Sequence, residues 1–126
     1  MKRKTGNAIV DLSLEYALAI IEFSEKLEET RKYVIAKQLL KAGTSIGANI
    51  WESQNAESKA DFIHKLKIAA KEADEVEYWL LLCQFSENYP NPGFLYTDLI
   101  SIKKLLSKII ASSKASLIKE NGKNNS

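Results

Sequence analysis

Cysteine is nearly absent from this sequence. Cys83 is the only one among 126 residues, so no disulfide can form within the chain. This excludes the disulfide framework of a small secreted domain and favours a cytoplasmic protein. Glycine and proline are also scarce, with five and two residues, and Pro90 and Pro92 share one short segment. Because tight turns depend on these residue types, the sequence predicts a few long helices joined by short connections.

Long apolar runs are missing as well. No segment approaches the roughly 18 consecutive apolar residues of a membrane-spanning helix, so we expect no membrane contact. The basic residues 1–4 are followed by Asp11 and Glu15, which interrupt the apolar stretch that an export signal requires. The composition, 45% hydrophobic and 27% charged, is that of a folded domain. We expect one domain at residues 1–118 and a polar, disordered tail at 119–126.

Catalytic and metal-binding chemistry finds little support in the sequence. His64 is the only histidine, and the pair Asp61-x-x-His64 occurs once, whereas a di-iron bundle uses two such pairs with further carboxylates. Cys83 continues an apolar helical seam, which predicts a core residue and not a nucleophile. Phosphate-binding loops, dinucleotide fingerprints and zinc-ligand spacings do not occur. We expect a protein that is not an enzyme, with no cofactor, metal ion or small-molecule substrate.

Four segments carry apolar residues at alternating three- and four-residue steps, the spacing of amphipathic helices. The first helix is predicted at residues 8–28, and the second begins near Arg31. The third begins at Ser58, where Asp61 completes a capping box, and the fourth follows the turn at 88–93. The predicted core positions are Ile9, Leu12, Tyr16, Ala19, Phe23; Ile35, Leu39, Ala42, Ile46, Ser53; Phe62, Leu66, Ala69, Ala73, Val76, Leu80, Cys83; and Leu95, Leu99, Ile102, Leu106, Ile109. The fold class is therefore all-α, an antiparallel up-and-down four-helix bundle.

Two glycines lie inside the second predicted helix. Gly43 and Gly47 each cost about 1 kcal/mol relative to alanine in a helix interior, so a continuous helix requires a compensating close approach of another helix. The alternative is a break followed by a new helix N-terminus. We favour continuity because the apolar spacing keeps its phase across residues 35–50.

The first two helices carry more apolar surface than a single facing core requires. Their second stripes consist of Leu14, Ala17, Leu18 and Ile21, and of Ala36, Leu40, Gly43 and Gly47. We therefore expect a homo-oligomer, in which this surface is buried against another subunit.

Two lysine-containing surfaces are candidates for binding. Lys37, Lys41 and Trp51 lie on one stripe of the second helix, away from its core positions. An outward tryptophan beside lysines suits either a stacked nucleobase or a subunit contact, and we favour the contact. The second candidate is the face of the fourth helix that carries Lys103, Lys104 and Lys108, although lysine-rich helix faces are most often simply solvated.

One ordered set of residues spans most of the chain and resembles a bacterial protein family. It consists of Ser45, Ile46, Gly47, Ala48, Asn49, Ile50, Glu52, Ser58, Asp61, Phe62, Leu66, Ile68, Ala69, Glu75 and Glu77. The set is similar to the four-helix-bundle proteins encoded in intervening sequences of large-subunit ribosomal RNA genes, often labelled ribosomal proteins. Lys71 and Glu72 depart from the Gly-Ser of many members. The resemblance implies a homopentameric barrel and a relationship to the accessory protein of diversity-generating retroelements, which binds a reverse transcriptase and RNA.

Polar residues of this set have a structural interpretation that we favour over a ligand site. Ser45 and Asn49 are predicted to satisfy polar groups between packed helices, with Glu75 or Glu77 directed toward the second helix. The leading functional hypothesis is a non-enzymatic oligomeric scaffold or accessory protein whose partners, by resemblance, are RNA or an RNA-handling protein. The alternative is a protein–protein interaction module without nucleic acid.

Overall fold

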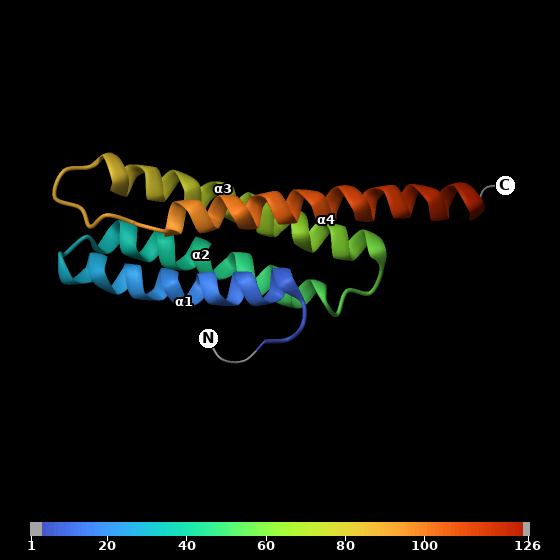
Figure 1. Ribbon diagram of the computed structural model, residues 1–126, viewed down its shortest axis with the longest axis horizontal. Helices are drawn as coiled ribbons and strands as arrows, with labels where there is room; N and C mark the ends of the chain where they lie inside the picture. The colour runs from blue at the N-terminus through green and yellow to red at the C-terminus, as the bar shows by residue number, and fades with distance from the viewer. Residues whose placement is uncertain (1–3, 125–126) are drawn as a thin grey trace.

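The computed structural model describes residues 4–124 and contains four helices over that range. They are α1 (Ala8–Glu29), α2 (Tyr33–Ser53), α3 (Lys59–Phe85) and α4 (Leu95–Asn124). Figure 1 shows the helices side by side, with the chain reversing direction at each connection. In ring order α1 contacts α2, α2 contacts α3, α3 contacts α4, and α4 returns to α1. The predicted all-α four-helix bundle is confirmed.

A side-chain cap begins α3 where expected. The Ser58 hydroxyl accepts the Asp61 N–H at 3.0 Å, while Asp61 Oδ2 accepts the Glu57 N–H at 3.2 Å, so the predicted cap of α3 is present. The second helix begins at Tyr33, two residues later than predicted. Arg31 has φ of 64°, a left-handed conformation that ends the preceding helix and cannot continue into the next.

α2 runs without a break through both glycines. A Cβ built on Gly43 would lie 2.7 Å from Cγ2 of Ile20, and one on Gly47 would lie 3.2 Å from the carbonyl oxygen of Ser13. The glycines therefore permit the backbone of α2 to lie close against α1. The prediction of a continuous helix is confirmed, with close helix approach as its physical reason.

The core lies along one seam of each helix. In α3 the predicted seam is buried from Leu66 to Cys83, while Phe62 is partly buried beside the fully buried Ile63. In α4 the residues Leu95, Leu99, Ile102 and Leu106 are buried, and in α2 the buried positions include Leu39, Ala42, Ile46 and Ser53. These three predicted seams are confirmed apart from the partial exposure of Phe62, Ile35 and Ile109.

The predicted core seam of α1 is confirmed at Ile9, Tyr16 and Phe23, which are buried, and is wrong at Leu12 and Ala19. Leu12 is 40% exposed and Ala19 is half-buried, whereas Ser13 and Ile20 are buried. The reason is the close packing on α2: Ser13 and Ile20 face the two glycines, which turns Leu12 toward α4. The second apolar stripe of α1 is exposed in the single chain.

The disordered tail predicted at 119–126 is corrected over its described part. α4 continues to Asn124 and extends past the other helices (Figure 1). Lys59 of α3 helps to hold this extension, because its ammonium donates to Ser116 Oγ at 2.6 Å and pairs with Glu120 at 2.7 Å. Residues 125 and 126 lie outside the described residues.

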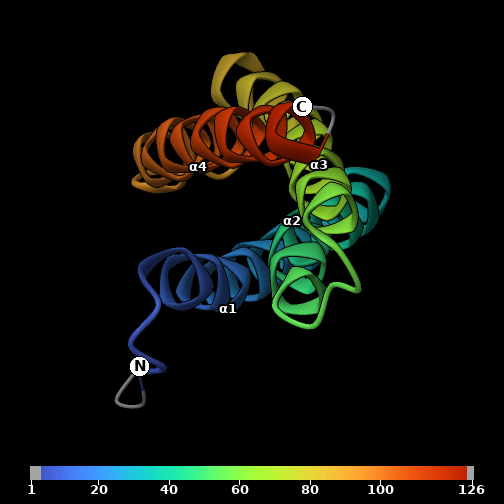
Figure 2. The same ribbon diagram turned by 90° about the vertical axis from the view of Figure 1, so that its right-hand side faces the viewer.

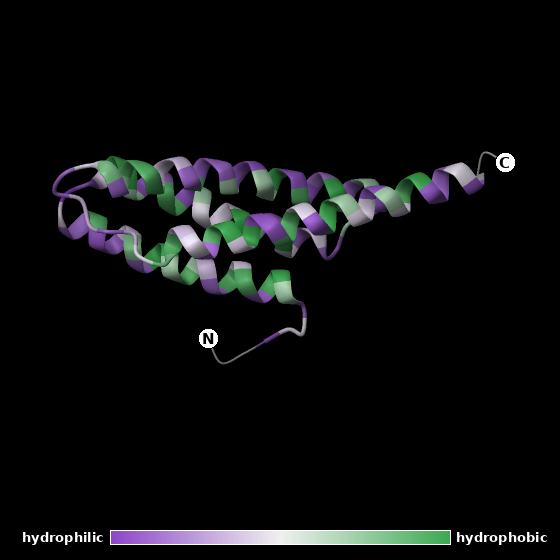
Figure 3. Cartoon of the chain, turned by 45° about the horizontal axis from the view of Figure 1, so that its top comes forward, coloured by the Kyte–Doolittle hydropathy of each residue, from purple (hydrophilic) through white to green (hydrophobic). Residues whose placement is uncertain are grey.

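Figure 2 views the bundle along its length and shows the α1 and α4 ribbons farther apart than those of the other neighbouring helices. Hydrophobic and hydrophilic residues alternate around all four helices in Figure 3, as expected for amphipathic helices. Within residues 4–124, no helix is long and apolar enough to cross a membrane.

Candidate interaction surfaces

The described part of the chain holds no group of three or more His, Cys, Asp or Glu residues that could bind a metal ion. His64 is exposed on α3. Cys83 is buried in the core, and this burial raises the pKa of its thiol to about 11. A thiol with such a pKa is almost entirely protonated near neutral pH, so it is a poor nucleophile.

Trp51 on α2 is 58% exposed and points away from the core as predicted. It borders a hollow of about 180 Å³ between α1 and α2. The hollow is lined by Val10, Ser13, Leu14, Ala17, Thr44, Gly47, Ala48 and Trp51. Leu14, Leu18 and Ile21 of α1 are exposed along the same stripe. We call this region, with Trp51, the α1/α2 face.

A second hollow, of about 280 Å³, adjoins Trp51 at the N-terminal end of α1. Its wall is more polar and includes Asn7, whose side-chain amide donates to Gln54 Oε1 at 3.1 Å. Trp51 thus separates an apolar hollow from a polar one. Side chains of Lys or Arg line neither hollow.

The candidate lysines do not gather into one site. Lys37 and Lys41 are exposed on α2, but Lys41 lies ten residues before Trp51, which corresponds to about 15 Å along the helix axis. Lys104 and Lys108 are exposed on α4, which does not contact α2. The structure therefore separates the two lysine surfaces by the width of the bundle.

Lys103 belongs to an internal ion-pair network and not to a free basic face. Its ammonium lies 2.5 Å from Glu77 Oε1 and 2.9 Å from Asp74 Oδ1, and Tyr96 donates its hydroxyl hydrogen to Glu77 Oε2 at 3.0 Å. Hydrogen bonds from Lys103 and Tyr96 lower the pKa of Glu77, while the bond to Glu77 raises the pKa of Lys103. The prediction that Lys103 contributes to a binding surface is corrected, because its charge is neutralised between α3 and α4.

The predicted polar network between helices is not formed by Ser45 and Asn49. Ser45 Oγ donates to the Lys41 carbonyl at 2.7 Å, and Asn49 Nδ2 donates to the Ser45 carbonyl at 2.9 Å, so both bonds stay within α2. Glu77 faces α4 and Glu75 is exposed, so neither is directed to α2 in the predicted way.

Other residues of the same set have structural roles. Glu52 lies 3.6 Å from the ammonium of Lys65, which links α2 to α3 at the surface. Ser58 and Asp61 cap α3, and Phe62 packs partly buried against the core. The set therefore marks helix ends and packing, and no common binding site brings its members together.

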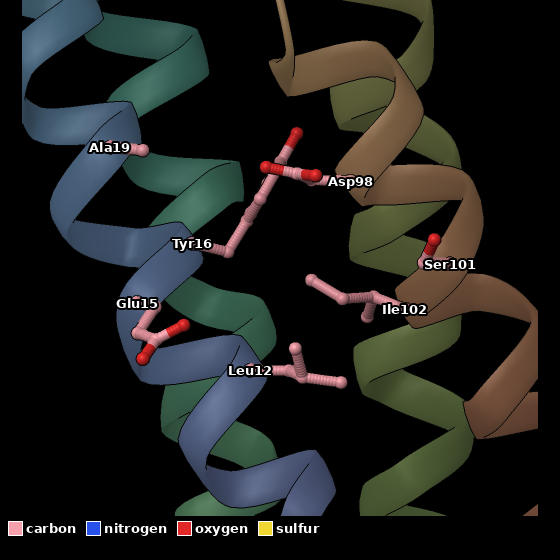
Figure 4. A pocket seen from close by; sticks show the side chains of 7 residues that line it. All are labelled: Leu12, Glu15, Tyr16, Ala19, Asp98, Ser101 and Ile102. Atoms are coloured by element: carbon pink, nitrogen blue, oxygen red, sulfur yellow. The ribbon is translucent and has the colours of Figure 1, made fainter. Parts of the chain in front are cut away.

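The α1/α4 edge holds a groove that the helical spacing did not predict (Figure 4). A hollow of about 210 Å³ is lined by Leu12, Glu15, Tyr16, Ala19, Asp98, Ser101 and Ile102. Tyr16 crosses the edge, since its buried hydroxyl donates to the Leu95 carbonyl at 2.9 Å. Burial, and secondarily the charge of Asp98, raises the pKa of Tyr16.

The groove continues toward the α3–α4 connection in a second hollow of about 330 Å³, which shares Ala19 and Asp98 with the first. Its other lining residues are Glu22, Phe23, Lys26, Asn91, Pro92, Gly93, Phe94 and Leu95. The sequence held one sign of this groove: acidic residues interrupt the apolar stripe of α1 on the side of Leu12.

The profile of the 23S rRNA-intervening sequence protein family matches residues 6–112. A crystal structure from Bacteroides thetaiotaomicron VPI-5482, of a protein with unknown function from the S23 ribosomal protein family, superposes with a TM-score of 0.77 at 46% identity. That match covers 81% of this chain and 97% of the other. No curated protein matches the chain.

Proposed function

Because the chain belongs to the 23S rRNA-intervening sequence protein family, we propose that it is a non-enzymatic accessory protein that acts as a homo-oligomer. The supporting observation is the α1/α2 face, where Trp51 and a stripe of leucine and isoleucine residues stay exposed in the single chain. Tryptophan is enriched where protein interfaces gain most of their binding energy, and a contiguous apolar patch favours burial against a partner.

The surroundings of Trp51 favour protein over nucleic acid as the occupant of this face. Apolar side chains line most of the hollow beside it, and the nearest candidate lysine on its stripe, Lys41, is ten residues or almost three turns away. Stacking of a nucleobase in an electrostatically favourable site requires cations near the ring. The α1/α2 face therefore suits a subunit contact.

The experiment is a mass measurement by light scattering on the wild type and on Trp51→Glu. We expect a wild-type oligomer, for which the family resemblance favours a pentamer, and a mutant of lower mass with unchanged helical circular dichroism. Tyr78→Glu is the matched control, since Tyr78 is 57% exposed but lies on α3. A wild-type monomer, or equal loss of mass in both variants, would contradict the proposal.

RNA, or an RNA-handling protein, is the partner that we propose for the assembled oligomer. The residues that favour RNA are Lys104 and Lys108, which are exposed one turn apart on α4. Retention on RNA should fall with added salt, and it should fall further in a variant with both lysines changed to Glu. Lys103→Met is not a test of RNA binding, because that lysine is paired internally. Retention no greater than that of an acidic control protein would favour the alternative, a protein–protein interaction module.

A further inference from the structure

The groove along the α1/α4 edge is apolar at its floor and acidic at its rim (Figure 4). Leu12 and Ile102 contribute to the floor. Glu15 and Glu22 of α1 stand on one side and Asp98 of α4 on the other, and none of the three has an ion-pair partner among residues 4–124. Lys26 is the one cation in the lining of either hollow. An occupant that fits this groove has an apolar stripe flanked by positive charges.

The last turns of α4 have this chemistry. The end of α4 extends past the other helices (Figure 1), and Ala111, Ala115 and Ile118 follow one another at four- and three-residue steps on one face, while Ser116 contacts Lys59 of α3 on another. Ile118 is 72% exposed, so its side chain is available for contact. Lys114 and Lys119 lie on the two flanks of this face. The segment is therefore an amphipathic helix with a basic border.

Length and charge both match the groove. Leu12 to Lys26, the part of α1 that borders the groove, is about 21 Å long, and residues 111–124 of α4 span about 20 Å. The positive charge of Lys67 lies close enough to lower the pKa of Lys114. Because the two ammonium groups repel each other, a carboxylate that approaches them would be attracted to both.

We propose that residues 111–124 of one copy dock into the α1/α4 groove of a second copy, with Ile118 against Leu12 and the flanking lysines beside Glu15 and Asp98. This inference rests on the proposed self-association, but it assigns a surface separate from the α1/α2 face. The two contacting patches differ, so the interface is heterologous and assembles chains head to tail into a ring or a filament.

Cross-linking of two single variants tests the docking. Leu12→Cys and Ile118→Cys chains are mixed and oxidised, and covalent dimers are measured on a non-reducing gel. Docking raises the effective concentration of the two thiols, so we expect about tenfold more dimer than in the control mixture. The control combines Ile118→Cys with Tyr78→Cys, because Tyr78 is exposed on α3 and lies outside both the groove and the α1/α2 face. The native Cys83 is buried, and oxidation of wild-type chains measures how much dimer this cysteine forms by itself.

A charge exchange provides the second measurement. Glu15→Lys with Asp98→Lys is expected to lower the mass in light scattering, and mixing this variant with Lys114→Glu/Lys119→Glu chains should restore it. If cross-linking equals the control and the charge exchange leaves the mass unchanged, the docking is overturned. If the docking is overturned in this way but Trp51→Glu still lowers the mass, the proposed function is supported without it. A wild-type monomer would contradict both.

Discussion

Helix α1 packs against α2 so closely that a methyl group at Gly43 would overlap Ile20 and one at Gly47 would lie tight against the Ser13 carbonyl, whereas against α4 it leaves a groove. On the α2 side, Ile20 is fully buried and meets Gly43 without room for a methyl group. On the α4 side, Leu12 is 40% exposed and the contact is completed by the hydrogen bond from Tyr16. One helix therefore has an edge closed by backbone approach and an edge left open for another molecule.

Truncation of one apolar side chain on each edge of α1 should give the largest difference in the free energy of unfolding. Ile20→Ala is expected to lower the free energy of unfolding by about 2–5 kcal/mol, because a closely packed site leaves a cavity. Leu12→Ala should cost less than about 1 kcal/mol, because solvent already reaches that side chain. Urea unfolding of both variants measures the difference. Equal losses would mean that the α4 edge is as closed as the α2 edge.

Introducing a methyl group at the closed edge is the next test. Gly43→Ala is expected to destabilise the chain by about 1–3 kcal/mol despite its better helix propensity, since the new Cβ overlaps Ile20. Gly122→Ala is the control: nothing lies within 4 Å of its Cβ position, so stability should stay equal or rise by less than about 1 kcal/mol.

The double variant Gly43→Ala/Ile20→Ala distinguishes a clash from a general loss of packing. If the new methyl group clashes with Ile20, shortening that side chain relieves part of the clash. The double variant should then lose less free energy of unfolding than the sum of the losses of the two single variants. Strict additivity would place the strain elsewhere in the α1–α2 contact.

The sequence predicted much of this packing, and the part that it did not predict has a physical cause. Gly43 and Gly47 inside an unbroken apolar phase predicted the close approach, and the regular seam of α3 predicted the core from Leu66 to Cys83. Periodicity shows that α1 is amphipathic, but it does not show which of two adjacent stripes faces the core. That choice depended on Ser13 and Ile20 packing on the glycines of another helix, a contact between residues about thirty positions apart.

The candidate site was less predictable than the fold. The exposure of Trp51 followed from its position on the stripe opposite the core of α2. The pairing of Lys103 did not, because its partners Asp74 and Glu77 lie on a different helix, and their distances depend on the register between α3 and α4. The α4 extension looked like a tail because its end is polar, yet Lys59 holds it from α3.

The hydrogen bond across the open edge should have a moderate effect. Tyr16→Phe keeps the buried ring and removes the donor to the Leu95 carbonyl, so we expect a loss of about 0.5–1.5 kcal/mol in the free energy of unfolding. Tyr78→Phe, at an exposed position of α3, should change stability little. If Tyr16→Phe is as stable as the wild type, the apolar contacts alone hold α4 against α1.

The remaining edge of α4, against α3, combines buried apolar residues with an ion pair at the surface, and the contribution of this ion pair should be the smallest. Hydrogen bonds from Lys103 and Tyr96 lower the pKa of Glu77 below the ordinary value of 4.5. A carboxyl whose pKa is lower in the folded state stabilises the fold above the unfolded pKa, and this contribution is lost as the pH falls through the folded pKa. Glu77→Gln should therefore cost less than about 1 kcal/mol at pH 7, because the pair is partly exposed, and should flatten the stability decline below about pH 4.5.

Urea unfolding of Glu77→Gln at pH 7, 5, 4 and 3 measures this contribution against the wild type and against Glu25→Gln, whose carboxylate is exposed on α1. The two curves for wild type and Glu77→Gln should converge toward acid pH, while Glu25→Gln follows the wild type throughout. A constant offset between wild type and Glu77→Gln would mean that packing of the side chain, and not its charge, attaches α4 to α3. Convergence would show that the charge of Glu77 adds to the apolar contacts between α3 and α4, so this edge of α4 is closed while its edge against α1 keeps a groove.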